Sequence, residues 1–173
     1  NFAKTPVNAV VDHLEIAAIT GNDPDTDALI SKLWQDNALD LEMPDLHRRA
    51  CEFGDAYLIE LPVEDDKGNV VSVEMFYNSP QTVRIIYSEE NPRVKEFAIK
   101  RWCDGPYVRA ELYYDDRTER WTTGKNQDGS KSGEWSPWTA TPEDGEPEDP
   151  ESWVIPHDYG EIPVFHYRTD RPY

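Results

Sequence analysis

Cysteine is scarce in this 173-residue sequence. The two cysteines, Cys51 and Cys103, lie 52 positions apart and form no CxxC pair. A disulfide framework or a zinc ribbon needs several cysteines at short spacings. The sequence therefore excludes both scaffolds and favours a protein of a reducing compartment.

Long hydrophobic runs are absent as well. No stretch reaches the roughly 18 apolar residues that a membrane-spanning helix requires. The first residues do not join a basic start to an apolar stretch, so we expect a soluble protein with neither a membrane span nor a signal peptide. The sequence starts at Asn1 rather than at methionine and stops at Tyr173, shortly after a proline. We therefore expect it to be a fragment of a longer chain.

Basic residues are outnumbered by acidic ones. The sequence contains 17 lysines and arginines against 35 aspartates and glutamates, which gives a net charge of −18. A surface of this sign repels phosphate groups, so we expect no sequence-general binding of DNA or RNA. Only nine glycines are present, and neither a GxGxxG nor a GxxxxGK[ST] motif occurs. We therefore expect no nucleotide-binding loop and no cofactor.

The sequence also offers no set of residues for nucleophilic or metal-based catalysis. No two histidines have the i, i+4 spacing of a helical zinc site. The histidines are His13, His47, His157 and His166. No GxSxG motif surrounds a serine, and Cys51 falls in a predicted amphipathic helix, where a buried and inert thiol is the common case. We expect no metal site and no enzymatic activity.

The first third of the sequence carries helical patterns. A Thr-Pro pair typical of a helix start, followed by apolar residues at helical spacing, predicts a first helix over residues 6–18. Asp25 or Thr26 is expected to cap a second helix that stops near Asn37. Pro44 is expected to open a third helix. The apolar face of that helix is expected to contain Leu46, Ala50, Phe53 and Tyr57.

From residue 56 onward the hydrophobic pattern alternates, as in strands. The predicted strands span residues 57–61, 70–76, 82–87, 94–102, 107–114, 120–123, 153–156 and 162–167. Residues 125–133 are expected to form a loop, and residues 141–151, with three prolines, six acids and no basic residue, a flexible surface loop. Helices followed by strands predict one α+β domain over residues 1–173, with N-terminal helices packed on an antiparallel β-meander. The helical part is expected to cover about 1–55 and the β part about 56–173.

Two groups of residues keep alternative functions open. Three tryptophans near a polar loop would suit a carbohydrate-binding module that stacks indole rings on sugars. These are Trp121, Trp135 and Trp138. Acidic runs at residues 64–66 and 115–116 would suit a carboxylate-based hydrolase. Residues 22–27 alternate oxygen ligands as a calcium loop does, but Ala28 and Trp34 stand where such a loop has glycine and glutamate. Each run also lies at a predicted helix start or hairpin turn, where acids satisfy backbone N–H groups, and we interpret the runs in that way.

Five short segments follow one another along nearly the whole sequence. They are NF with PVNAVVD (1–2 and 6–12), LWQDNALD (33–40), ACEFGDAY (50–57), RW (101–102) and GEIPVFHY (160–167). In their order and spacing these segments resemble the portal, or head-to-tail connector, proteins of tailed double-stranded-DNA bacteriophages and prophages.

The resemblance implies the peripheral wing domain of a portal subunit, which in the full protein precedes a stem helix and a clip. It implies a structural subunit without ATPase or other enzymatic activity, assembled as a dodecameric ring at one vertex of the virion capsid. The implied partners are other copies of the subunit, terminase, the major capsid or scaffold protein and head-completion proteins. DNA would pass through the assembled channel without specific binding by this part, and assembly would take place in the cytoplasm of the bacterial host.

Overall fold

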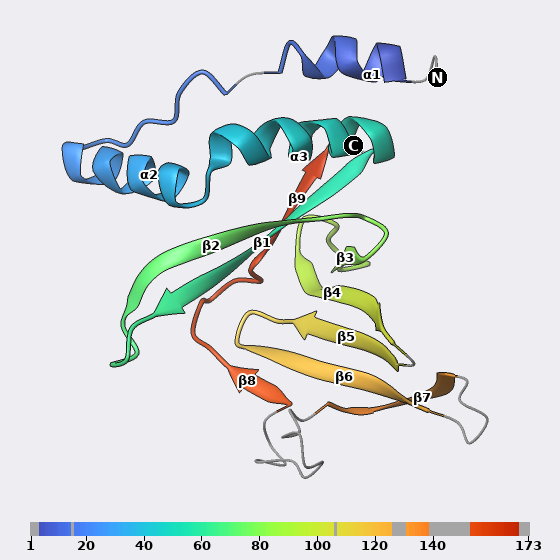
Figure 1. Cartoon of the computed structure of the whole chain (residues 1–173). Helices are drawn as coiled ribbons and strands as arrows, with labels where there is room; N and C mark the ends of the chain where they lie inside the picture. The colour runs from blue at the N-terminus through green and yellow to red at the C-terminus, as the bar shows by residue number, and fades with distance from the viewer. Residues whose placement is uncertain (1–3, 15, 106, 126–130, 139–152, 170–173) are drawn as a thin grey trace. The chain divides into compact units, whose positions relative to one another are not determined.

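The computed structural model describes residues 4–14, 16–105, 107–125, 131–138 and 153–169. Three helices and antiparallel sheets confirm the predicted α+β class (Figure 1). The chain divides into two compact units. The helical unit is Asn1–Pro80 with Phe165–Tyr173, and the meander unit is Gln81–Val164. The single domain expected over the whole chain stays a prediction.

The helical unit begins with α1 (Lys4–Val11), which is shorter than the helix predicted over residues 6–18. The chain tightens after α1, since the backbone N–H of His13 donates to a carbonyl only three residues back. Beyond this turn Ile16 lies across a shallow hollow from Trp34 of the next helix. The predicted extension of the first helix is therefore wrong, because the i−3 hydrogen bonds of His13 and Leu14 end the helix after Val11.

α2 (Pro24–Asp36) stops at Asn37, as predicted. Its N-cap is Asp23 rather than Asp25 or Thr26, because the proline takes the first helical position and places Asp23 directly before it. The Asp23 carboxylate accepts hydrogen bonds from the backbone N–H groups of Asp25 and Thr26 at 3.1 and 2.9 Å. Hydrogen bonding from Thr26, chiefly its backbone N–H, lowers the pKa of the Asp23 carboxyl.

α3 (Leu39–Phe53) starts before Pro44, so the predicted start of the third helix is wrong. The buried residues of this helix are Leu39, Met43, Leu46 and Ala50. Leu39 and Met43 precede the proline. Their burial keeps the start of the helix in place, although Pro44 has no N–H group to donate within it. Phe53, expected on the buried face, is exposed because it is the last residue before Gly54 ends the helix with a φ of 85°. Tyr57 is buried, but in the following strand.

The sheet of the helical unit has the strand order β2-β1-β9. β1 (Asp55–Glu64) and β2 (Val70–Asn78) form the predicted antiparallel hairpin, and β9 (Val164–Arg168) joins β1. At the hairpin turn the Asp65 carboxylate accepts from the backbone N–H of Asn69 at 2.9 Å. The buried face of α3 packs against Ala56 and the partly buried Trp34, Met75, Tyr77 and Tyr167. α2 and α3 therefore lie against this sheet, and α1 packs on α3 (Figure 1).

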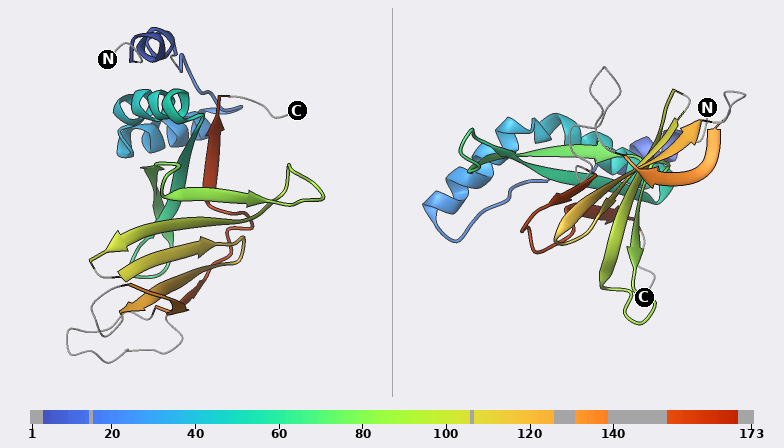
Figure 2. Two further views of the ribbon diagram at one scale, coloured as in Figure 1. Left: turned by 90° about the vertical axis from the view of Figure 1, so that its right-hand side faces the viewer. Right: turned by 90° about the horizontal axis from the view of Figure 1, so that it is seen from below.

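The meander unit is a twisted six-stranded sheet (Figure 2). Its strands are β3 (Val83–Tyr87), β4 (Lys95–Asp104), β5 (Tyr107–Tyr113), β6 (Arg117–Lys125), β7 (Lys131–Pro137) and β8 (Val154–Pro156). β3 to β7 pair in sequence order and antiparallel, which confirms the predicted meander. β7 and β8 both pair with β6, at Trp121–Lys125 and Arg117–Glu119 respectively, so they lie end to end along one of its edges.

β7 was not predicted. Its residues overlap the loop expected at 125–133, because a segment of lysine, serine and glycine gives no alternating apolar signal. The acidic stretch 141–151 lies outside the described residues. In the ranges that are described, no helix combines the length and the apolar character needed to cross a bilayer.

Candidate interaction surfaces

Two of the three tryptophans considered for sugar binding share one face of the meander sheet. Trp135 lies opposite Thr123, which is two positions from Trp121 on the same strand, so both indoles project from this face. Trp121 is packed edge-on against Trp153 with ring centres 5.1 Å apart. Its Nε1 donates to the Glu119 carboxylate at 3.2 Å. Trp121 is thus engaged in packing within the unit.

Trp138 belongs to the opposite face, where it stacks on Arg109. The guanidinium of Arg109 lies 4.3 Å from the ring centre of Trp138 and 4.7 Å from that of Tyr107. Its Nη1 donates to Thr122 Oγ1 at 2.6 Å and its Nε to the Asp104 carboxylate at 3.2 Å. The Arg109 side chain is only 14% exposed. Arg109 therefore joins β4, β5 and β6, and the three tryptophans do not form one platform for a sugar.

The acidic runs are occupied by local structure. Asp23 caps α2, and Asp65 holds the β1–β2 turn. Asp116 pairs with Arg117 at 2.8 Å, and Arg117 also pairs with Glu119 at 2.8 Å. These carboxylates serve neighbouring N–H groups and a guanidinium rather than facing one another across a cleft. Among the described side chains, no group of three or more His, Cys, Asp and Glu could hold a metal ion.

The histidines lie in different environments. His13 is exposed after α1, whereas His47 lines a hollow beside α3. His157 stacks on a tyrosine with ring centres 3.8 Å apart, and burial lowers its pKa. His166 of β9 contacts the Asp55 carboxylate of β1 at 2.7 Å. His13, His47 and His166 belong to the helical unit, and His157 belongs to the meander unit.

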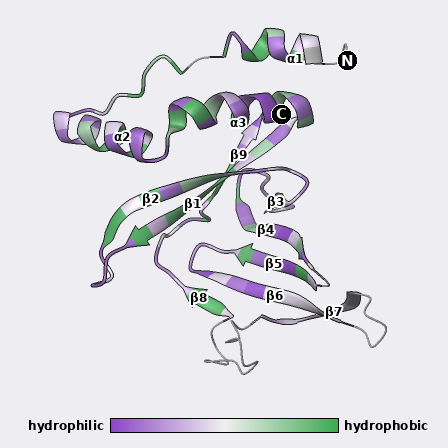
Figure 3. Ribbon diagram, viewed as in Figure 1, coloured by the Kyte–Doolittle hydropathy of each residue, from purple (hydrophilic) through white to green (hydrophobic). Residues whose placement is uncertain are grey.

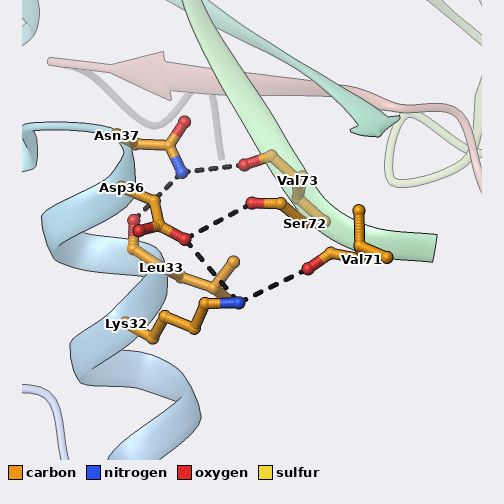
Figure 4. A network of polar contacts seen from close by, with 7 residues as sticks. All are labelled: Lys32, Leu33, Asp36, Asn37, Val71, Ser72 and Val73. Carbon is orange, nitrogen blue, oxygen red and sulfur yellow. Dashed lines mark hydrogen bonds and ion pairs between the residues drawn. The ribbon is translucent and has the colours of Figure 1, made fainter. Parts of the chain in front are cut away.

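A polar contact at the end of α2 fastens the helix layer to the edge of the sheet (Figure 4). Asn37 Nδ2 donates to the carbonyls of Val73 and Leu33 at 2.8 and 3.0 Å. The backbone N–H of Met75 donates to Asn37 Oδ1 at 2.8 Å. β2 is the outer strand of its sheet, so the Asn37 amide takes the place of a partner strand at this point.

An apolar hollow of about 590 Å³ lies between α1, α3 and β9. The residues that line it include Val7, Val10, Leu14, Ala50, Cys51 and Tyr167. None of its lining residues is acidic, and burial raises the pKa of the Tyr167 phenol. We call this hollow the α1 groove. Figure 3 shows the mixture of hydrophobic and hydrophilic residues along the two helices that border it. A concave and largely apolar surface of this kind suits contact with another protein segment.

Sequence reasoning missed the residues that build these surfaces. The apolar spacing of Val7, Val10 and Leu14 was visible, but it predicted a face packed on a core rather than a groove. Asn37 was identified only as the end of a helix, since its contact with β2 joins residues far apart in the sequence. For Arg109 a signal did exist, because Tyr107 lies two positions before it and therefore on the same face of a strand.

The sequence model of the family described as "Phage portal protein, SPP1 Gp6-like" matches residues 1–172. A search of curated proteins returns no match. The family match extends over both the helical unit and the meander unit.

Proposed function

Because the chain belongs to the SPP1 Gp6-like family of phage portal proteins, we propose that it is the peripheral wing part of a portal subunit. Portal proteins are structural proteins that assemble as oligomeric rings at the capsid vertex of a phage. The observation that carries the proposal is the family match over residues 1–172. In the proposed assembly twelve copies form a closed ring, first in the host cytoplasm and then within the virion.

The proposed role extends to the partners and the path of the DNA. Terminase would dock on the ring and drive DNA through it, and capsid or scaffold protein and head-completion proteins would bind its outside. A net charge of −18 repels DNA and so disfavours tight contacts that would stall its sliding.

The local roles of the candidate catalytic residues support a protein without enzymatic activity. Asp23 and Asp65 serve as a helix cap and a turn acceptor, and Asp116 pairs with Arg117. Trp121 and Trp138 are used in packing. A ring subunit needs no nucleophile or phosphate loop, so these structural uses agree with the proposed role.

The proposal is tested by the assembly state of the full-length subunit. We expect electron microscopy and sedimentation to show a closed ring, because each copy can offer two different patches that repeat around a circle. Residues 1–173 alone should be mainly monomeric, with weak association promoted by salt, which screens the repulsion between acidic copies. A full-length subunit that stays monomeric would overturn the portal assignment of function.

A further inference from the structure

One face of the meander sheet carries two neighbouring arginines. Residues directly opposite each other in antiparallel strands share a face of the sheet. Arg84 of β3 lies opposite Ile99 of β4, and Arg101 follows Ile99 by two positions, so all three project from one face. The Arg101 guanidinium lies 5.9 Å from the ring centre of Trp135, an indole that is 42% exposed. We call the surface formed by Arg84, Ile99, Arg101 and Trp135 the arginine face.

The two arginines of this face are available to a partner. Both are exposed, and among the described residues neither forms an ion pair. Arg117 of the same sheet differs, since it pairs with Asp116 and Glu119, each at 2.8 Å. A planar guanidinium can bind a carboxylate through two N–H groups, and arginine and tryptophan are enriched where proteins bind one another. The arginine face therefore suits a protein segment that carries acids beside apolar side chains.

The turn of the β1–β2 hairpin carries side chains of this kind. Residues 64–71 are all exposed, and we call them the hairpin tip. Val70 is 59% exposed and lies directly opposite Glu64, so an apolar and an acidic side chain share one face of the tip. The Asp65 carboxylate is used by the turn itself. The carboxylates of Glu64 and Asp66 are left for a partner.

We propose that in the assembled ring the hairpin tip of one subunit docks on the arginine face of the next subunit. The proposal rests on the proposed function, because it requires a ring. The carboxylates of Glu64 and Asp66 accept hydrogen bonds from the guanidinium groups of Arg84 and Arg101, and the apolar side chain of Val70 contacts the arginine face between them. The tip and the arginine face are two different patches of each copy, and such a contact repeats until the ring closes.

Charge favours a second copy as the occupant of the arginine face. Every copy has a net charge of −18, so neighbouring copies repel one another unless acids of one meet cations of the next where they touch. Both patches are exposed in the single chain, so each is open to a partner. DNA is the less suitable occupant, because a phosphate backbone brings no apolar side chain to cover Ile99 and Trp135.

A natural cysteine allows a direct test in the full-length ring. Cys103 is exposed and lies two positions from Arg101 on the same strand, so it belongs to the same face. In the test protein Asp66→Cys is introduced in the hairpin tip, while Cys51 and any cysteine outside residues 1–173 are replaced by serine. The assembled ring is treated with a short bis-maleimide and analysed by denaturing gel electrophoresis. Docking between copies predicts a ladder of covalent multimers, and the matched protein that also carries Cys103→Ser should give none.

The outcomes separate this proposal from the proposed function. An intact ring that yields only internally cross-linked single chains, or no cross-link at Cys103 at all, overturns the docking of the hairpin tip and leaves the portal function standing. A parent subunit that forms no ring by electron microscopy overturns both. A ladder in the intact ring that disappears with Cys103→Ser supports the docking.

A charge exchange provides a second readout that does not depend on cross-linking. Arg101→Glu should raise the subunit concentration needed for half-assembly by about tenfold or more, and adding Asp66→Arg to the same chain should restore most of the loss. Arg93→Glu makes the same charge change at an exposed position in the turn between β3 and β4, and it should raise this concentration by much less. Equal assembly of Arg101→Glu and Arg93→Glu, or no recovery with Asp66→Arg, would contradict the docking.

Discussion

The helical unit and the meander unit bury their side chains in different ways. In the helical unit, Leu39, Met43 and Leu46 form an aliphatic cluster between α3 and the sheet. In the meander unit Val83, Ile85 and Val108 are also buried, but cations lie on aromatic rings beside them, as Arg109 does on Trp138. A flat guanidinium can cover an indole face and still reach polar partners. The difference shows how a sequence with 38% hydrophobic residues can complete a second packed sheet with cations and aromatic rings.

The two units also differ in their balance of charge. The segments of the helical unit contain seven basic and 17 acidic residues, and the meander segment contains ten and 18. Six of the acids of the meander segment lie in residues 141–151, so the rest of that segment is close to balance. With net charges of −10 and −8, both units should contribute to repulsion between copies at low ionic strength.

The largest effect is expected from the aliphatic cluster. Leu46 is 1% exposed, and Leu46→Ala should lower the free energy of unfolding by about 2–5 kcal/mol, because it leaves a cavity in the cluster. Chemical denaturation of the chain measures this change. Leu41 of the same helix is 76% exposed, and Leu41→Ala should change stability by less than about 0.5 kcal/mol. Similar losses in the two variants would contradict a core built on Leu46.

The same variant tests the single domain predicted from the sequence. Five of the six tryptophans belong to the meander segment, so tryptophan fluorescence reports chiefly on that unit, whereas far-ultraviolet circular dichroism reports on the helices. If the units unfold as one domain, Leu46→Ala should shift both signals to the same midpoint. A shift of the dichroism signal alone would show that the units unfold separately and would overturn the single-domain prediction.

A smaller effect is expected at the edge of the helical unit's sheet. Asn37→Ala removes the partner of the Val73 carbonyl and the Met75 N–H, and this should cost about 1–3 kcal/mol of unfolding free energy. Asn37→Asp keeps an acceptor for Met75 and should lose less. Gln35→Ala, at an exposed position two residues earlier on α2, is the matched control and should be near neutral. If Gln35→Ala lowers the denaturation midpoint as much as Asn37→Ala does, Asn37 does not hold α2 to the edge strand.

Sequence patterns predicted the elements whose signals are local. The β1–β2 turn followed from the run of Asp, Gly and Asn at residues 65–69, and the end of α2 was correct at Asn37. The start of α3 was wrong because the burial of residues before Pro44 outweighs the preference of proline for a first turn. β7 was missed because its pairing with β6, not its composition, makes it a strand. The α1 groove could not be predicted, since α1, α3 and β9 meet only in three dimensions.

In the meander unit, Arg109→Lys should be destabilising by about 1–2 kcal/mol, because lysine cannot reproduce the fork that bonds Thr122 and Asp104 while stacking on Trp138. The near-ultraviolet dichroism of the tryptophans should change with it. Arg84→Lys makes the same replacement at an exposed position of β3. It should leave both the stability and the near-ultraviolet dichroism close to those of the parent. If the two variants behave alike, cation–aromatic packing does not distinguish this unit from the helical one.

The smallest effect is expected at the hairpin turn of the helical unit and depends on pH. The hydrogen bonds from the side chain and then the backbone of Asn69, together with that from the backbone of Lys67, lower the pKa of the Asp65 carboxyl. A carboxyl with a lowered pKa in the fold stabilises the protein above its unfolded pKa of about 3.9, and this contribution is lost as the pH falls through the folded pKa. Asp65→Ala should therefore be less stable than the parent near neutral pH, and the difference should shrink on acidification below about pH 4.

Asp66→Ala removes the adjacent acid, which accepts none of these hydrogen bonds, and its difference in stability from the parent should not change with pH in this way. Unfolding curves of the three proteins across this range test the assignment, and a constant gap between the parent and Asp65→Ala would overturn it.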